Sequence, residues 1–157
     1  MFMGVMIPMK RERMLTIRVT DDEHAHKLCF EITETAAVEN LPQALILMER
    51  LHQHGCKFAL DDFGSGLSSF AYLRSFPVDF LKIDGVFVRN IDKDPINYSI
   101  VASITEIGHT TGKGIIAEYV EDESIVTCLE KIGVDFVQGY AIERPKEFVA
   151  KNTRARR

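Results

Sequence analysis

The chain has 157 residues and a mass of 17.8 kDa, the length of a single domain, and 46% of its residues are hydrophobic, enough for a sizeable core. Its net charge of -4 and pI near 5.7 argue against a protein that follows the phosphates of a nucleic acid polymer, because such proteins are normally basic. The charge favours no membrane role, and we expect no membrane segment, since no apolar run is long enough to cross a bilayer.

The first residues, Met1 to Met9, form an apolar run whose positive charges follow it. A signal peptide has the opposite order, so we do not interpret this run as one. A second N-terminal stretch, Met14 to Thr20, is a candidate edge strand. The three cysteines, Cys29, Cys56 and Cys128, are odd in number and lack metal-ligand spacing. They are typical of reduced core thiols, which predicts a cytoplasmic protein.

From residue 28 onward, short apolar runs alternate with segments of helical length. The runs that predict strands are Leu28 to Glu34, Phe58 to Gly64, Phe80 to Asp84, Ile115 to Glu118 and Phe136 to Gly139. Three helices are predicted by their apolar stripes and terminal residues: Leu41 to Leu51 between Asn40 and Gly55, Ile96 to Ile107 after Asp94-Pro95, and Ile125 to Ile132 before Gly133. A weaker pattern predicts a short helix from Ser68 to Ser75. This order predicts an α/β fold with a parallel sheet.

Each predicted strand gives way to a polar residue at its carboxyl end. These residues are Glu31, Asp61 with Asp62, Lys82, Glu118 and Gln138. Parallel sheets place their chemistry at this edge, so we expect the side chains to converge on one pocket. Four neighbouring carboxylates repel one another unless cations or protons intervene, which favours a divalent metal site. The alternative is that each carboxylate only caps the loop or helix that follows it.

The adjacent pair Asp61-Asp62 needs a local explanation, because consecutive strand residues point to opposite faces. Both can reach one site only where the strand is already ending, and Gly64 and Gly66 supply that freedom. Lys82 would neutralise a phosphate, hold a water or form a salt bridge with a neighbouring aspartate. The pairs His24-x-His26 and His52-x-His54 have poor spacing for one helical face, so we interpret them as surface histidines.

The motif order resembles that of a known family. It runs Glu31-Ile32-Thr33-Glu34, Asp61-Asp62-Phe63-Gly64-Ser65-Gly66, Leu81-Lys82-Ile83-Asp84, Ala117-Glu118-Tyr119-Val120-Glu121 and Gln138-Gly139-Tyr140, closing with Arg144-Pro145. This set resembles the EAL domain family of bacterial cyclic di-GMP phosphodiesterases, over about Leu28 to Phe148. The resemblance implies a TIM-like (β/α) barrel that hydrolyses cyclic di-GMP to linear pGpG with two Mg²⁺ or Mn²⁺ ions.

The resemblance also implies roles for the residues. The positions matching Glu31 and Asp61 bind metal, and the position matching Asp62 serves a second metal ion. Lys82 orients the attacking water, and Glu118 is a base or a metal-side partner. The remaining members are supporting or substrate-side residues: Glu121 and Gln138 line the site, and Glu34 steadies the loop that carries Asp61-Asp62.

The chain also departs from the family pattern. The Glu-x-Leu motif on an early strand and the Asn ligand on the strand after it are absent, and Glu12-Arg13-Met14 is no substitute. Tyr119 stands where the family usually has glycine. A complete barrel of this type takes about 250 residues. The chain therefore resembles only the C-terminal part, about five βα units plus a possible N-terminal strand.

These departures divide the chain into an atypical N-terminal segment (1–27), a partial EAL domain (28–148) and a basic C-terminal tail (149–157). An incomplete barrel has open edges, so we expect either a homo-oligomer or cover by the N-terminal segment. A possible upstream signalling domain is a further expected partner. Two function classes stay open: a phosphodiesterase that is weak or inactive as this chain, and a noncatalytic module that binds cyclic di-GMP or a protein.

Overall fold

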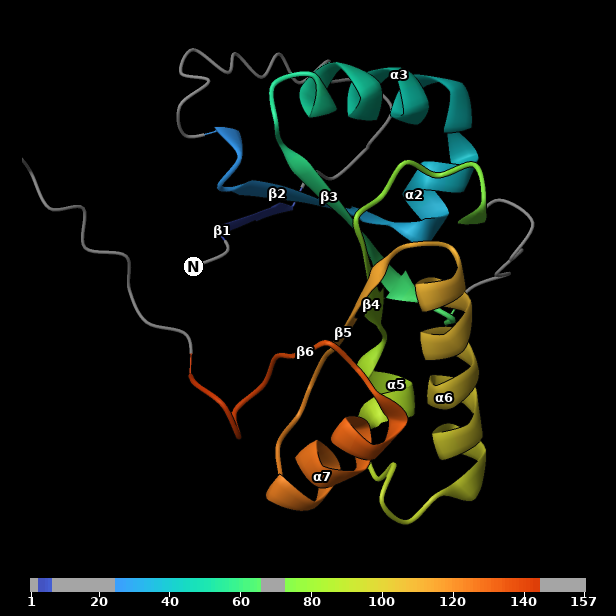
Figure 1. Ribbon diagram of the computed structural model, residues 1–157, viewed down its shortest axis with the longest axis vertical. Coiled ribbons are helices and arrows are strands. Elements are labelled where there is room, and N and C mark those ends of the chain that lie inside the picture. The colour runs from blue at the N-terminus through green and yellow to red at the C-terminus, as the bar shows by residue number, and fades with distance from the viewer. Residues whose placement is uncertain (1–2, 7–24, 66–72, 145–157) are drawn as a thin grey trace, which may run out of the picture.

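The computed structural model describes residues 3–6, 25–65 and 73–144, and these form one parallel sheet with helices (Figure 1). The sheet has six strands in the order β1-β2-β3-β4-β5-β6, each parallel to the next. Their bounds are β1 Met3–Met6, β2 Leu28–Thr33, β3 Lys57–Phe63, β4 Phe80–Ile83, β5 Gly114–Ala117 and β6 Phe136–Val137. All five predicted strands from residue 28 onward are confirmed, and so is the incomplete α/β barrel.

The three strongly predicted helices are confirmed as α3 Leu41–His52, α6 Pro95–Thr110 and α7 Glu123–Ile132, and two shorter helices, α2 Glu34–Glu39 and α5 Gly85–Val88, precede α3 and α6. The Asp94 carboxylate caps α6 by accepting hydrogen bonds from the amides of Ile96 and Asn97. Gly133, at a φ of 91°, ends α7 in the left-handed conformation that glycine adopts readily. Most of the helix predicted from Ser68 to Ser75 lies outside the described residues.

The N-terminal strand beside β2 is β1, whose Met3 is in register with Leu28. It precedes the stretch that the sequence favoured, Met14 to Thr20, which lies outside the described residues, as does the basic tail 149–157. Among the described residues, no helix has the length and apolar character needed to cross a membrane.

The two faces of the sheet differ. The described helices lie on one face, where alternate strand residues such as Phe30, Leu60 and Leu81 build the main core with them (Figure 1). The opposite face, the inner face of the partial barrel, carries a small buried cluster of Cys29, Ala59 and Phe80. A cavity of about 600 Å³ opens over that cluster.

The cysteines fit the prediction of core thiols. All three are free, Cys29 and Cys56 are buried, and Cys128 is half-buried. Burial, together with the charges of Glu31 and Asp79, raises the pKa of the Cys29 thiol to about 11. A thiol with that pKa stays protonated at neutral pH, which makes Cys29 a poor nucleophile.

Candidate active site

The polar residues predicted at the strand ends lie on the inner face because each is two positions after an apolar residue of that face. Each follows, two positions later, an inner-face residue of its own strand: Cys29 then Glu31, Ala59 then Asp61, Phe80 then Lys82, Ile116 then Glu118, and Phe136 then Gln138. Residues two apart on a strand share a face. The period of the strands thus directs five side chains from five different strands toward the same side of the sheet.

Lys82 is the centre of the group. Its Nζ lies 2.8 Å from Glu118 Oε1, 3.0 Å from Asp61 Oδ1 and 3.2 Å from Glu31 Oε2. The Lys82 side chain is only 5% exposed, so these ion pairs are shielded from water. Of the alternatives that the sequence left open for Lys82, the salt bridge is therefore present in this state of the protein. One ammonium group compensates three carboxylates, which leaves the cluster with excess negative charge.

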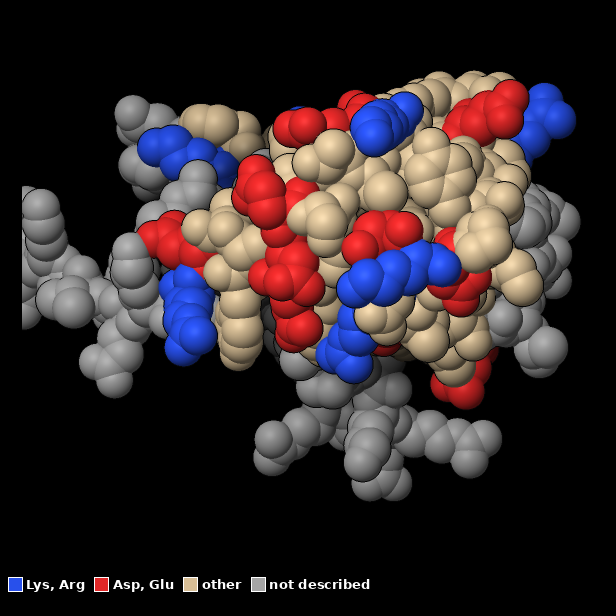
Figure 2. Space-filling model, turned by 90° about the horizontal axis from the view of Figure 1, so that it is seen from below, with Lys and Arg blue, Asp and Glu red and all other residues tan. Residues whose placement is uncertain are grey.

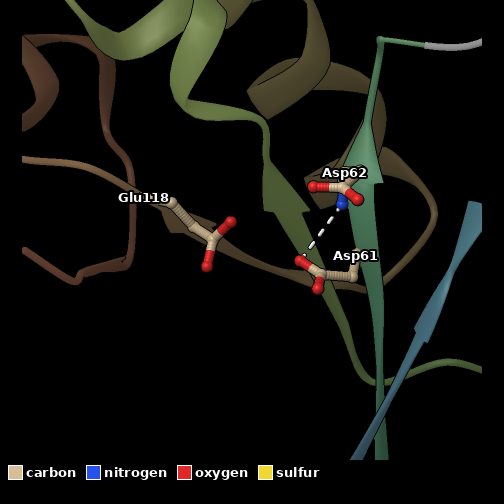
Figure 3. A group of neighbouring side chains, drawn as sticks. All are labelled: Asp61, Asp62 and Glu118. Atoms are coloured by element: carbon tan, nitrogen blue, oxygen red, sulfur yellow. Dashed lines mark hydrogen bonds between the residues drawn. The ribbon is translucent and has the colours of Figure 1, made fainter. Parts of the chain in front are cut away.

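Asp61 and Asp62 reach the same site because the backbone of β3 is irregular at Asp62. Asp62 has a φ of 54°, in the left-handed region, and the register between β3 and β4 shifts between Leu60 and Phe63. The Asp62 amide donates to Asp61 Oδ1 at 3.1 Å, and both carboxylates point toward Glu118 (Figure 3). The pair lies next to the end of β3, which stops one residue later at Phe63. Both Asp62 and Gly64 have a positive φ, so the irregularity begins at Asp62 and includes the first glycine, whereas Gly66 lies outside the described residues.

The electrostatics of the cluster reflect this crowding. Burial raises the pKa of the Glu118 carboxyl above its ordinary value, although Lys82 opposes the change. Burial and the neighbouring charges of Asp61 and Asp84 raise the pKa of Asp62. Burial disfavours the charged form of Lys82, but its hydrogen bonds to Glu118 and Asp61 prevail and raise the pKa of its ammonium group. A raised pKa means that the ionised carboxylate is unfavourable in this environment, and a bound cation or proton would offset its charge.

Two further predicted residues line a neighbouring cavity. Gln138 and Glu121 are exposed and border a cavity of about 330 Å³ that also includes Glu118. Glu34 is buried in the first turn of α2, after the cap residue Thr33. The structure therefore brings together the strand-end residues and places Glu121 at their border, and the supporting role of Glu34 beside the loop of Asp61-Asp62 stays a prediction.

Tyr119, which the sequence marked as a bulky residue in place of a family glycine, lines the same cavity as Glu118 and Tyr140. Sequence reasoning missed Arg89, whose guanidinium lies over the Tyr119 ring, 4.6 Å from its centre. Arg89 follows the short helix α5 and had no signal of its own, because only folding brings it to Tyr119.

One histidine prediction is also corrected. His26 and His54 are exposed as expected, whereas His52 is half-buried against the Phe58 ring and hydrogen-bonds to Asp79 at 3.0 Å. The prediction failed because His52 lies at the end of α3, where the helix meets the start of β3. His24 lies outside the described residues.

The residues present fit a divalent cation. One carboxylate oxygen from each of Asp61, Asp62 and Glu118 lies within 4.8 Å of the others (Figure 3). Hard oxygen ligands of this kind suit Mg²⁺ and Mn²⁺. Figure 2 views the molecule from below, the end at which α7 lies, and shows acidic side chains with basic ones among them on that face.

The chain is similar in sequence to known proteins. The model of the EAL domain matches residues 12–145. The cyclic di-GMP phosphodiesterase PdeB of Shewanella oneidensis is 46% identical over 119 residues, which are 76% of this chain and 14% of that protein. The chain thus spans about one seventh of the length of this curated relative.

Solved structures show the same likeness. The PaMucR phosphodiesterase in complex with c-di-GMP matches with a TM-score of 0.73 and 34% identity, over 78% of this chain and 49% of that one. Klebsiella pneumoniae BlrP1 was solved in a manganese and cyclic di-GMP complex, which matches with a TM-score of 0.70 and 31% identity over 74% of this chain and 30% of that one. The calcium and cyclic di-GMP complex of the same protein matches with a TM-score of 0.69 and 31% identity, over 74% of this chain and 29% of that one.

Proposed function

The chain belongs to the EAL domain family, and we propose on this basis that it is a cyclic di-GMP phosphodiesterase module, weak or inactive on its own, that hydrolyses the cyclic dinucleotide to pGpG. The observation that carries the proposal is the contact of Lys82 Nζ with three carboxylates from three different strands. Two of these carboxylates, Glu31 and Glu118, line cavities, and a cluster of charges with perturbed pKa values that faces a cavity is typical of a functional site.

In this proposal Asp61 and Asp62 hold Mg²⁺ or Mn²⁺ together with Glu31, which shares Lys82 with Asp61, and Glu118 lies beside the same two aspartates. Such ions, when bound, acidify a water and offset charge on the phosphoryl oxygens. Lys82 keeps Asp61 and Glu118 in position and donates a hydrogen bond to the attacking water. Glu118 accepts a proton from that water, which its raised pKa favours. The water oxygen bonds to phosphorus, the ester bond to the ribose 3′ oxygen breaks, and that oxygen takes up a proton.

We expect low turnover because this chain lacks the family's Glu-x-Leu motif on an early strand and the Asn ligand on the strand after it. Removing ligands from a two-metal site costs several kcal/mol of transition-state stabilisation, since charge neutralisation by the ions carries much of the rate. The remaining ligands would bind the ions weakly, with water completing their coordination.

The test is hydrolysis of cyclic di-GMP by the purified chain with Mg²⁺ or Mn²⁺, followed by separation of the product pGpG. We expect turnover well below about 1 s⁻¹, the lower end of ordinary enzymes, and its loss in Glu118→Gln. Glu106→Gln, on the exposed side of α6, is the matched control and should leave the rate unchanged. Turnover that survives Glu118→Gln would contradict the assigned role, and turnover at about 1 s⁻¹ or more would show that the missing ligands matter less than proposed.

A second candidate function is a noncatalytic module that binds cyclic di-GMP or a protein partner. The salt bridges of Lys82 favour it, because they already neutralise part of the cluster without an ion. Binding of cyclic di-GMP without any pGpG, at all Mg²⁺ and Mn²⁺ concentrations tried, would select this candidate over the enzyme.

We also propose a homo-oligomer in which a second copy covers the inner face. Support comes from the cavity on that face, whose apolar lining includes the half-buried Ile116 and the 46% exposed Phe136. Light scattering should give more than the monomer mass at micromolar protein, and Phe136→Glu should shift it toward the monomer. A monomer mass for the unmodified chain would contradict the oligomer.

The cellular setting is proposed on weaker grounds. Free, buried thiols suit a reducing compartment, so we place the protein in the cytoplasm. The curated relative is much longer than the matched part, which supports an upstream signalling domain as a partner of this unit. The division into residues 1–27, 28–148 and 149–157 remains part of this proposal.

A further inference from the structure

Tyr119 has an unusual backbone for its residue type. It directly follows Glu118, and its φ of 55° is in the left-handed region. Bulky side chains rarely adopt this conformation, and they keep it only where the surroundings fix them. The Tyr119 residue is nevertheless 51% exposed, so its strained position is not explained by burial in the core. Strain at an exposed aromatic beside a reactive carboxylate points to a ligand contact.

The ring of Tyr119 is held from two sides. The Arg89 guanidinium covers one face, with its Cζ 4.6 Å from the ring centre. Gly85, at the start of α5, leaves space for the ring, because a Cβ at that position would overlap the Tyr119 side chain. Both contacts come from the segment of α5 and its C-cap, and Tyr119 is still 51% exposed, so part of the ring surface is accessible to a ligand. A ring fixed in this way loses little freedom when a ligand binds.

Tyr119 also separates two cavities. It lines the cavity of about 330 Å³ that includes Glu118 and Gln138, and it lines another of about 440 Å³ beside Asp84 and Asn90. Carboxylates of Glu121 and Glu143 border the smaller cavity. Guanine offers two adjacent N–H donors on its pairing edge, which a carboxylate accepts, whereas adenine does not offer that pair.

We propose that Tyr119 is a specificity-determining residue whose exposed ring surface stacks on a guanine base of the bound dinucleotide, within the smaller cavity. This inference rests on the proposed function, which supplies cyclic di-GMP as the ligand. Stacking on an aromatic ring is a common way in which proteins hold an unpaired base. The position beside Glu118 then fixes the phosphodiester relative to the base.

The experiment compares binding of cyclic di-GMP by calorimetry in the presence of Ca²⁺, the ion in one BlrP1 complex. The proteins are the unmodified chain, Tyr119→Phe, Tyr119→Leu and Tyr119→Gly. Tyr98→Leu, an exposed tyrosine on α6 that borders neither cavity, is the matched control. We expect Tyr119→Phe and Tyr98→Leu to stay within about twofold of the unmodified chain, and Tyr119→Leu and Tyr119→Gly to bind at least about tenfold more weakly.

Tyr119→Gly separates binding from folding, because glycine adopts a positive φ without strain and should leave the melting temperature equal or higher. Equal or tighter binding by Tyr119→Gly and Tyr119→Leu would overturn the inference while leaving the proposed function intact. An unmodified chain that binds no cyclic di-GMP would overturn the proposed function and this inference with it. Binding of cyclic di-AMP as tight as that of cyclic di-GMP would contradict the assigned guanine contact.

Discussion

The two ends of the parallel sheet hold ionisable side chains in opposite ways. At the amino end, each of two aspartates accepts a hydrogen bond from a backbone N–H and forms a second one with a histidine ring. Asp79 Oδ2 lies 2.8 Å from the Phe58 amide and 3.0 Å from His52 Nε2. Asp135 Oδ2 lies 2.7 Å from the Ile115 amide and 2.8 Å from His109 Nε2. Both arrangements tie the end of a helix to the start of a strand.

At the carboxyl end the carboxylates share one cation instead. Lys82 contacts Glu31, Asp61 and Glu118, and the pKa values of Glu118 and Asp62 are raised rather than lowered. The comparison shows that a carboxylate whose hydrogen bonds come from a nearby backbone amide and a histidine serves to stabilise the fold. Where like charges are gathered around one cation and face a cavity, the arrangement costs stability and points to a function.

The largest effect should come from removing the shared cation. Lys82→Met leaves three carboxylates without their counter-charge, and we expect a loss of about 3–5 kcal/mol in the free energy of unfolding. Urea denaturation checks this, with Lys93→Met as the control. Lys93 is 77% exposed and pairs with Asp92 at 3.7 Å, so its loss should cost less than about 1 kcal/mol. A Lys82→Met loss as small as that of the control would remove the contrast between the two ends.

A smaller effect is expected at the amino end. Asp79→Ala removes the acceptor of the Phe58 amide and of His52, which should cost about 1–3 kcal/mol. The loss should leave the binding of cyclic di-GMP and divalent ions unchanged, because Asp79 lies at the other end of the strands. Urea denaturation and Mg²⁺ titration together check this, and weakened Mg²⁺ binding in Asp79→Ala would show that the two ends are coupled.

Divalent ions should stabilise the carboxyl end only. At a Mg²⁺ concentration of ten times the dissociation constant, the linkage relation gives about 1.4 kcal/mol of added stability. We expect weak affinity, and Asp61→Asn should reduce both the affinity and the rise in melting temperature. A micromolar or tighter Mg²⁺ affinity that Asp61→Asn leaves unchanged would contradict the assigned metal site.

The smallest effect should be the pH dependence of the amino end. Burial opposes ionisation of Asp135, but hydrogen bonds from His109 and the Ile115 amide prevail and lower the pKa of its carboxyl below the ordinary value. The unfolded chain then binds the proton more readily than the folded one. The contribution is therefore complete above about pH 4, the ordinary aspartate range, and is lost as the pH falls through the lower folded pKa.

We expect this contribution to stay below about 1 kcal/mol, because the Asp135 side chain is 37% exposed and solvent screens it. Melting temperatures measured from pH 6 down to pH 2 check this. Asp135→Asn should begin from a lower stability at pH 6 and lose less of it on acidification. An acid transition of the same size in both proteins would assign the pH dependence to other groups.

Much of this fold could be predicted from local patterns. The strand that ends in Asp61 was evident from its apolar run, and α6 from Asp94-Pro95 and its isoleucine stripe. The cluster itself was predicted as a set of strand-end residues. The conformation of Asp62 could not be predicted, because a left-handed residue inside a strand follows from the pairing of β3 with β4 rather than from its neighbours in the chain.

The sequence by itself determined which side chains face the inner side of the sheet, since the period of two is a property of each strand alone. It also determined the helix ends, which depend on residues only a few positions apart. Only the tertiary structure decided that Lys82 contacts three carboxylates and that Arg89 covers Tyr119. Those contacts join segments far apart in the chain, and the stagger between strands and the packing of α5 set their distances, which no local pattern encodes.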